Sequence, residues 1–209
     1  MEPNPKQPLM PFESCIEFLE NKGKKLYSPN FRIYPEDYEV IFKLLVYFIK
    51  DTGNAEKYNI SLRKGVLLSG PVGCGKTSLM NLFRFYLEDN SRHIIKSCRD
   101  ISYEFIRDGF SVIHKYSRAA FVHEVPKIYC FDDLGIENNL KYYGNDCNVM
   151  AEIMLSRYDL FISHRMFTHI TTNLNSSEIG EMYGERVRSR MREQFNLIAF
   201  DKNSKDKRV

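Results

Sequence analysis

The chain has 209 residues, of which 43% are hydrophobic and 13% aromatic, and its formal net charge at neutral pH is +3. This length and composition suit one sizeable α/β domain and exclude a disordered chain. A charge this small neither requires nor excludes a nucleic acid partner.

The cysteines and the apolar stretches indicate the compartment. None of the five cysteines forms a Cys-x-x-Cys pair, which favours free thiols in a reducing compartment. The longest apolar stretch, residues 40–49, is interrupted by Lys43 and is too short to span a bilayer. We therefore expect a cytoplasmic protein that has no membrane partner.

Two helices are predicted before the first strand. Residues 12–23 have the pattern of a short helix that ends at Gly23. Pro35, followed by two acidic residues, opens a second helix, whose apolar positions form one wide stripe up to about residue 50. Residues 52–64 are predicted to be a polar connection, because Gly53 and Asn54 are turn signals.

Residues 70–77 carry the first chemical motif. They fit the Gly-x-x-x-x-Gly-Lys-Ser/Thr pattern of a P-loop, whose backbone N–H groups wrap phosphates. A short apolar run precedes the motif and a helical pattern follows it, which is the setting that a P-loop requires. Lys76 is then expected to contact the β- and γ-phosphates of ATP and Thr77 to hold Mg²⁺. The alternative is a glycine turn before an ordinary helix. The predicted nucleotide-binding residues are Gly70, Pro71, Val72, Gly73, Cys74, Gly75, Lys76, Thr77 and Ser78.

An apolar run at residues 127–131 ends in two carboxylates, Asp132 and Asp133. Between it and the P-loop we expect a strand at residues 93–98 and a helix at residues 100–116, so the pattern is that of a parallel sheet covered on both faces. In a P-loop protein, one acid at such a strand end holds Mg²⁺ and a second accepts a proton from the attacking water. We assign Asp132 to the metal and Asp133 to the water. The alternative is a strand that runs into an Asp-rich turn.

Two later segments add polar groups. A β-branched run ends at Asn173, whose amide can orient water near the γ-phosphate if its strand lies beside that of Asp132; an asparagine after a strand is also a common turn or cap residue. Residues 184–192 form an arginine-rich helical pattern in which Arg186 and Arg190 share one face. Such arginines can reach the nucleotide of a neighbouring subunit, or they can form a solvated or nucleic-acid-binding helix.

Four segments of the chain together resemble motifs of the AAA+ ATPases, and within them of the DnaC/IstB-like branch. They are Gly-Pro-x-Gly-x-Gly-Lys-Thr, Asp132-Asp133-Leu134-Gly135, Thr171-Thr172-Asn173-Leu174 and Gly184-Glu185-Arg186-x-x-Ser189-Arg190. The resemblance implies a three-layer α/β fold with a five-stranded parallel sheet in the order 5-1-4-3-2. It implies ATP between subunits, Asn173 as sensor 1, Arg190 as the arginine finger, and self-association through the Arg190 face. We expect residues 1–59 to form a helical lead and residues 60–209 the ATPase core, which leaves no room for a C-terminal helical lid.

The resemblance also implies work on DNA. We expect an ATPase that is slow and is stimulated by DNA or a partner. The first hypothesis is a helicase loader that binds single-stranded DNA and a replicative helicase, and the alternative is a transposition helper that binds a transposase. Two rival hypotheses come from other classes of protein. One is a small-molecule P-loop kinase, and the other is a nucleotide-gated binding module that hardly hydrolyses ATP.

Further candidates are weaker. Arg208 is a candidate for a sensor 2 residue. The five histidines form no ligand set, so we expect no metal site other than that for Mg²⁺. Basic and aromatic residues that can contact single-stranded DNA by charge and stacking are Arg99, Arg107, His114, Lys115, Arg118, Lys141, Tyr142 and Tyr143.

Overall fold

The computed structural model of the chain describes residues 11–88, 91–137, 140–142 and 145–208. Within these residues, one sheet contains five parallel strands in the order β2-β5-β8-β1-β9. Counted along the chain, the five strands stand in the predicted order 5-1-4-3-2. They are β1 (Gly65–Ser69), β2 (Ile94–Ser97), β5 (Tyr129–Leu134), β8 (Thr168–Thr172) and β9 (Phe195–Ala199).

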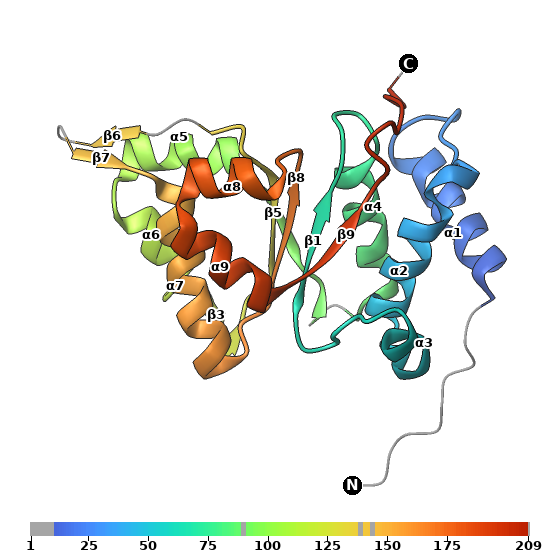
Figure 1. The fold of residues 1–209 in the computed structure, drawn as a ribbon, viewed down its shortest axis with the longest axis horizontal. Helices are drawn as coiled ribbons and strands as arrows, with labels where there is room; N and C mark the ends of the chain where they lie inside the picture. Colours follow the sequence, from blue (N-terminus) through green and yellow to red (C-terminus); the bar gives the residue numbers. More distant parts are fainter. Residues whose placement is uncertain (1–10, 89–90, 138–139, 143–144, 209) are drawn as a thin grey trace, which may run out of the picture.

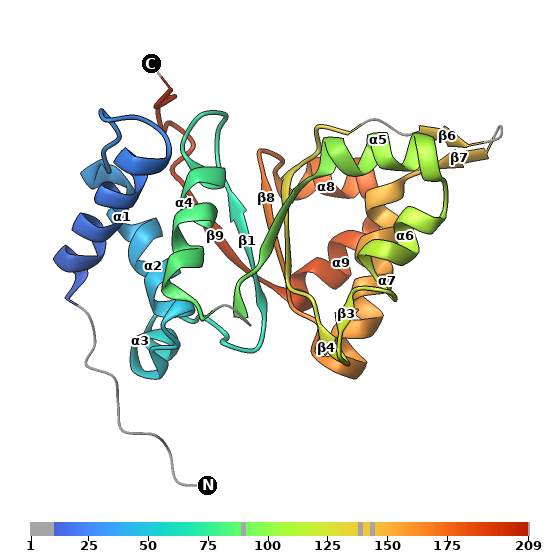
Figure 2. The same cartoon turned by 180° about the vertical axis from the view of Figure 1, so that it is seen from behind.

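Helices cover both faces of the sheet, which gives the three layers that were predicted (Figures 1 and 2). One side carries α1 (Phe12–Leu26), the 3₁₀ turn η1 (Pro35–Asp37), α2 (Tyr38–Phe48), α3 (Thr52–Lys57), α4 (Lys76–Phe83) and η2 (Arg84–Tyr86). The other carries α5 (Cys98–Asp108), α6 (Ser111–Tyr116), α7 (Val149–His164), α8 (Ser176–Tyr183) and α9 (Glu185–Gln194). Two small hairpins are β3–β4 (Phe121–Val122, Val125–Pro126) and β6–β7 (Leu140–Tyr142, Asn145–Cys147).

The two faces of the sheet bury two separate apolar clusters. Because side chains alternate along a strand, Leu67 of β1 joins the cluster under α5 and α7, while Val66 and Leu68 join the cluster under α2 and α4. Leu19 of α1 and Leu44 of α2 are fully buried in that second cluster. The N-terminal helices therefore share the core of the P-loop side of the sheet.

Three local predictions are wrong. Helix α1 continues past Gly23 to Leu26, since Gly23 is a packing position whose missing side chain leaves room for the ring of Phe31. Residues 52–57 form helix α3, because Asp51 caps it by accepting the backbone N–H of Asn54. The helix predicted over residues 100–116 is two helices, which meet at Gly109 with a φ of 61°.

Three further features of the described chain concern its last residues, its apolar helices and its cysteines. Residues 200–208 contain no helix. In the part of the chain that the structure describes, no helix is long and apolar enough to cross a bilayer. All five cysteines are free and buried.

Two histidines lie buried between the sheet and α2. The rings of His93 and His169 are 5.1 Å apart. His93 Nε2 lies 2.9 Å from the carbonyl oxygen of Met80, whereas its Nδ1 has no partner among the described residues. His169 Nδ1 accepts the backbone N–H of Val66 at 3.1 Å. Burial lowers the pKa of His93 to about 4 and holds that of His169 well below 6.5.

Acid should therefore destabilise the fold. An unfolded histidine is protonated near pH 6.5 but native His93 only near pH 4, so the unfolded state binds more protons between these values and stability is lost as the pH falls. From His93 alone we expect a loss of about 3 kcal/mol over this window, measured by urea unfolding at several pH values. His93→Gln, which keeps an N–H donor for Met80, should lose less, and exposed His114→Gln should match the wild type. A wild-type pH profile for His93→Gln would contradict this account.

Candidate functional site

The P-loop has the backbone geometry that its sequence predicts. Gly73 and Gly75 have φ angles of 78° and 102°, in the left-handed region that favours glycine. Gly75 is the N-cap of α4 and offers no side chain to the first turn of the helix. The N–H groups at the start of α4 are therefore available to an anion.

Lys76 joins the P-loop to the strand of Asn173. Its side chain is buried, and Nζ donates to the carbonyl oxygens of Gly70 and Pro71 at 2.9 and 2.8 Å and to Asn173 Oδ1 at 2.6 Å. Burial lowers the pKa of Lys76, against the attraction of Asp132 and Asp133. The structure thus brings Lys76 and Asn173 together.

Asp132 is the common acceptor of two hydroxyl groups. Thr77 Oγ1 donates to its two carboxylate oxygens at 2.8 and 3.0 Å, and Thr171 Oγ1 donates to Oδ1 at 2.7 Å. Burial raises the pKa of Asp132, while these hydroxyl donors oppose the rise. When the hydroxyl hydrogen of Thr77 points to Asp132, the lone pairs of the hydroxyl oxygen point away from Asp132. The hydroxyl oxygen and the carboxylate oxygens then lie side by side. Such hard oxygen ligands fit Mg²⁺.

Asp133 is turned toward the cavity by an irregularity in the sheet. The pairing of β5 with β8 shifts register between Phe131 and Leu134, and Asp133 has a φ of 56°, which aspartate tolerates better than most residues. Its backbone N–H donates to Thr171 Oγ1 at 2.9 Å. A bulge of this kind redirects a side chain, and Asp133 lines the cavity.

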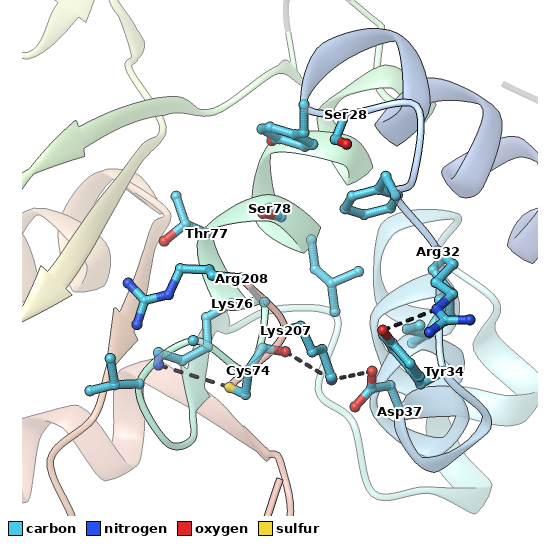
Figure 3. A pocket seen from close by; sticks show the side chains of 18 of the residues that line it. Ser28, Arg32, Tyr34, Asp37, Cys74, Lys76, Thr77, Ser78, Lys207 and Arg208 are labelled. Carbon is cyan, nitrogen blue, oxygen red and sulfur yellow. Dashed lines mark hydrogen bonds and ion pairs between the residues drawn. The ribbon is translucent and has the colours of Figure 1, made fainter. Parts of the chain in front are cut away.

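The cavity has a volume of about 1020 Å³, and Figure 3 shows the side chains that line it. The predicted residues on its wall are Val72, Gly73, Cys74, Gly75, Lys76, Thr77, Ser78, Asp133, Asn173 and Arg208. The opposite wall was not predicted. It combines aromatic and apolar residues with polar or charged ones; the first are Tyr27, Phe31, Ile33, Tyr34 and Ile41, and the second are Ser28, Asn30, Arg32 and Asp37. The P-loop side offers N–H groups and a lysine to charged phosphates, and the rings of the opposite wall suit a flat, weakly polar base, so the cavity suits a nucleotide.

Sequence reasoning also missed Thr171 and Lys207. Thr171 stands in β8 two residues before Asn173, and this position near the polar strand end is the signal that could have identified it. Lys207 lines the cavity beside Arg208, and no motif marks it. Arg208 itself forms a fork with Asp206, at 3.0 and 2.8 Å.

The arginines of α9 lie away from this cavity. Arg190 is half-buried, 3.6 Å from Asp159 and stacked over the ring of Tyr158 at 4.6 Å. Arg186 is exposed and has no partner among the described residues. The structure therefore does not bring Arg190 to the P-loop of its own chain.

The basic candidates for DNA contact are partly engaged within the chain. Arg107 forms a fork with Asp108, and Lys115 donates to Glu104 at 2.8 Å. Other members of the set are exposed, namely Arg99, His114 and Arg118. Lys141 and Tyr142 belong to β6, and Tyr143 lies outside the described residues.

Comparisons with known proteins support the fold. No family model matches the sequence, and no curated protein is significantly similar to it. Among solved structures, the chain is similar to the DnaC helicase loader, with 16% identity and a TM-score of 0.56 over 83% of this chain and 94% of the other. A candidate primosome component from Streptococcus pyogenes serotype M3 gives 16% identity and a TM-score of 0.54, covering 82% of this chain and 83% of the other.

A third solved structure, a DNA replication initiation factor, gives 16% identity and a TM-score of 0.50, and covers 82% of this chain but 48% of the other. Because these identities are low, the comparisons show similarity of fold only. They show that the chain shares the fold of the DnaC helicase loader, which is the fold that the motifs predicted.

Thr171 supplies a prediction about the metal. Thr171→Val removes the hydroxyl that donates to Asp132 and accepts from Asp133, so we expect a loss of about 1–3 kcal/mol in stability and a weaker effect of Mg²⁺ on nucleotide binding. Thr172→Val is the matched control, because that hydroxyl bonds Leu134 and Leu174 instead. Thermal unfolding with ATP, with and without Mg²⁺, measures both effects. An equal response to Mg²⁺ in the two variants would contradict the assignment.

Proposed function

We propose that this protein binds Mg-ATP and hydrolyses it, as an AAA+ ATPase of DNA replication and most specifically as a DnaC-like helicase loader. One observation carries the proposal: the Lys76–Asn173 contact and the Thr77–Asp132–Thr171 cluster meet at the carboxyl edge of adjacent strands, beside a cavity that Lys76, Thr77 and Asn173 line. In open α/β sheets, ligands bind at that edge.

Each residue has a separate task. The P-loop N–H groups and Lys76 bind the phosphates, and Thr77 and Asp132 hold Mg²⁺, which neutralises charge that develops on the phosphates. Asp133 accepts a proton from the attacking water. Asn173 orients that water and, through its bond to Lys76, fixes the lysine relative to β8.

The replication role rests on similarity of fold and motif. The DnaC helicase loader is matched over most of both chains, so we infer a replicative helicase and single-stranded DNA as partners. A transposition helper that binds a transposase is the alternative from the motifs alone. For assembly, we propose that α9 faces the nucleotide of a second copy and supplies Arg190, which must first leave Asp159 and Tyr158.

The nucleotide proposal predicts separable effects on binding and turnover. Mg-ATP should raise the melting temperature of the wild type by mass action, and Lys76→Ala should abolish most of that rise. Asp133→Asn should bind Mg-ATP nearly as well as the wild type but hydrolyse it about a hundredfold more slowly, since only the proton acceptor is lost. Single-turnover hydrolysis with and without single-stranded DNA measures the rates. An unchanged ATP response in Lys76→Ala would remove the P-loop interpretation.

Assembly predicts rescue between two inactive variants. Arg190→Ala should bind ATP but lose the stimulated rate, by about a thousandfold or more if the arginine acts in trans. Adding Lys76→Ala protein, which still presents Arg190, should restore part of the rate through mixed interfaces. Arg192→Ala, at an exposed position of the same helix, is the control. Rescue of Arg186→Ala but not of Arg190→Ala would move the assignment by one helical turn, and a rate per subunit that is independent of protein concentration would contradict assembly.

A further inference from the structure

The chain after β9 crosses the P-loop. The backbone N–H of Phe200 donates to the carbonyl oxygen of Ser69 at 2.8 Å, and the backbone N–H of Lys207 donates to the carbonyl oxygen of Gly73 at 3.0 Å. A Cβ placed on Gly73 would lie 2.1 Å from the carboxylate of Asp206. Residues 200–208 are therefore in direct contact with the phosphate-binding loop.

The side chain of Lys207 lies between the P-loop and the N-terminal wall of the cavity (Figure 3). Its Nζ donates to the carbonyl oxygen of Cys74 at 3.0 Å and forms an ion pair with Asp37. The ammonium also lies 5.2 Å from the ring centre of Phe200 and 5.6 Å from that of Tyr34. The side chains of Lys207 and Asp37 are only 15% and 6% exposed, so the contact is well shielded from water.

Lys207 thereby fixes two successive peptide groups of the P-loop. Its N–H and Nζ hold the carbonyl oxygens of Gly73 and Cys74 toward the tail. In a planar trans peptide the C=O and N–H groups point in opposite directions, so the N–H of Gly75 is directed away from Lys207. No described residue accepts a hydrogen bond from that N–H. It is therefore free to serve as one of the donors with which such a loop binds phosphate.

Asp37 ties the same ammonium to the opposite wall. It ends η1, directly before α2, and it lines the cavity. Its Oδ2 bonds Lys207, whereas Oδ1 has no partner among the described residues. Burial raises the pKa of Asp37 and the nearby ammonium opposes this rise. The ammonium of Lys207 thus stabilises the charged form of the Asp37 carboxylate. The ion pair between them also links the cavity wall that contains Asp37 to the P-loop.

We infer that Lys207 is a positioning residue of the nucleotide site, which keeps the P-loop peptides in their phosphate-binding orientation and links them to the Asp37 wall. The inference rests on the proposed nucleotide-binding function. It assigns a role to a residue of the C-terminal tail that contacts the loop through the carbonyl oxygens of Gly73 and Cys74.

Nucleotide titration of the full chain tests this role. Lys207→Met keeps the apolar stem and removes the ammonium, so the Kd values of Mg-ATP and Mg-ADP should both rise roughly ten- to a hundredfold, which corresponds to one charge-assisted hydrogen bond. In steady state, KM should rise while kcat at saturation stays within about twofold, because loop donors bind substrate and transition state alike. A residue that only supports the fold would lower the melting temperature and leave the Kd of folded protein unchanged.

Three further variants make the result decisive. Asp37→Asn keeps the shape and an acceptor, so it should raise Kd less, and the double variant should be no worse than Lys207→Met alone. If Lys207→Met does not fold, Asp37→Asn decides by the same titration. Lys205→Met removes an exposed lysine of the same tail and should bind as the wild type. Binding that is lost in Lys76→Ala but unchanged in Lys207→Met and Asp37→Asn would overturn this role alone, whereas no binding by the wild type would overturn the nucleotide site itself.

Discussion

The Asp132 carboxylate is the point on which the rest of the site depends. It accepts the hydroxyls of Thr77 and Thr171, and so it ties β5 to the start of α4 on one side and to β8 on the other. A buried carboxylate needs such donors, because an unpaired one would be costly. The same bonds that satisfy Asp132 place Thr77 next to it, so one arrangement meets both the requirement of burial and the geometry of the proposed Mg²⁺ site.

The opposite ends of the same strands are held by a buried arginine. Arg157 of α7 is fully buried and stacks over the rings of Tyr129 and Phe131. Its guanidinium donates to Thr168 Oγ1 and to three carbonyl oxygens, those of Tyr116, Lys127 and Phe167. The carbonyl of Phe167 lies one residue before β8 and that of Lys127 two residues before β5. Both strands are therefore held by side-chain hydrogen bonds near each end.

The sequence predicts the parts of the site that depend on short motifs. A P-loop, an acidic strand end and a polar strand end each lie within a few residues, and the parallel sheet brings their carboxyl ends together. The position of Lys207 depends on contacts across 130 residues or more of chain, and Tyr27 of the opposite wall bonds Asn81 across 54 residues. No local pattern encodes such contacts. The errors at Gly23 and Gly109 have the same origin, because glycine serves as a helix end, a bend or a packing position according to its tertiary neighbours.

The division of work between the two adjacent acids follows from their surroundings. Asp132 is occupied by hydroxyl donors and nearly buried, so its oxygens are oriented and suit a fixed ligand such as a metal ion. Asp133 stands one residue later on the bulge, lines the cavity, and its carboxylate has no hydrogen-bond partner among the described residues. An acceptor for the proton of a transient water has to be accessible and uncommitted, and of the two only Asp133 meets that condition. A one-residue register shift in β5 therefore separates the proposed metal ligand from the proposed base.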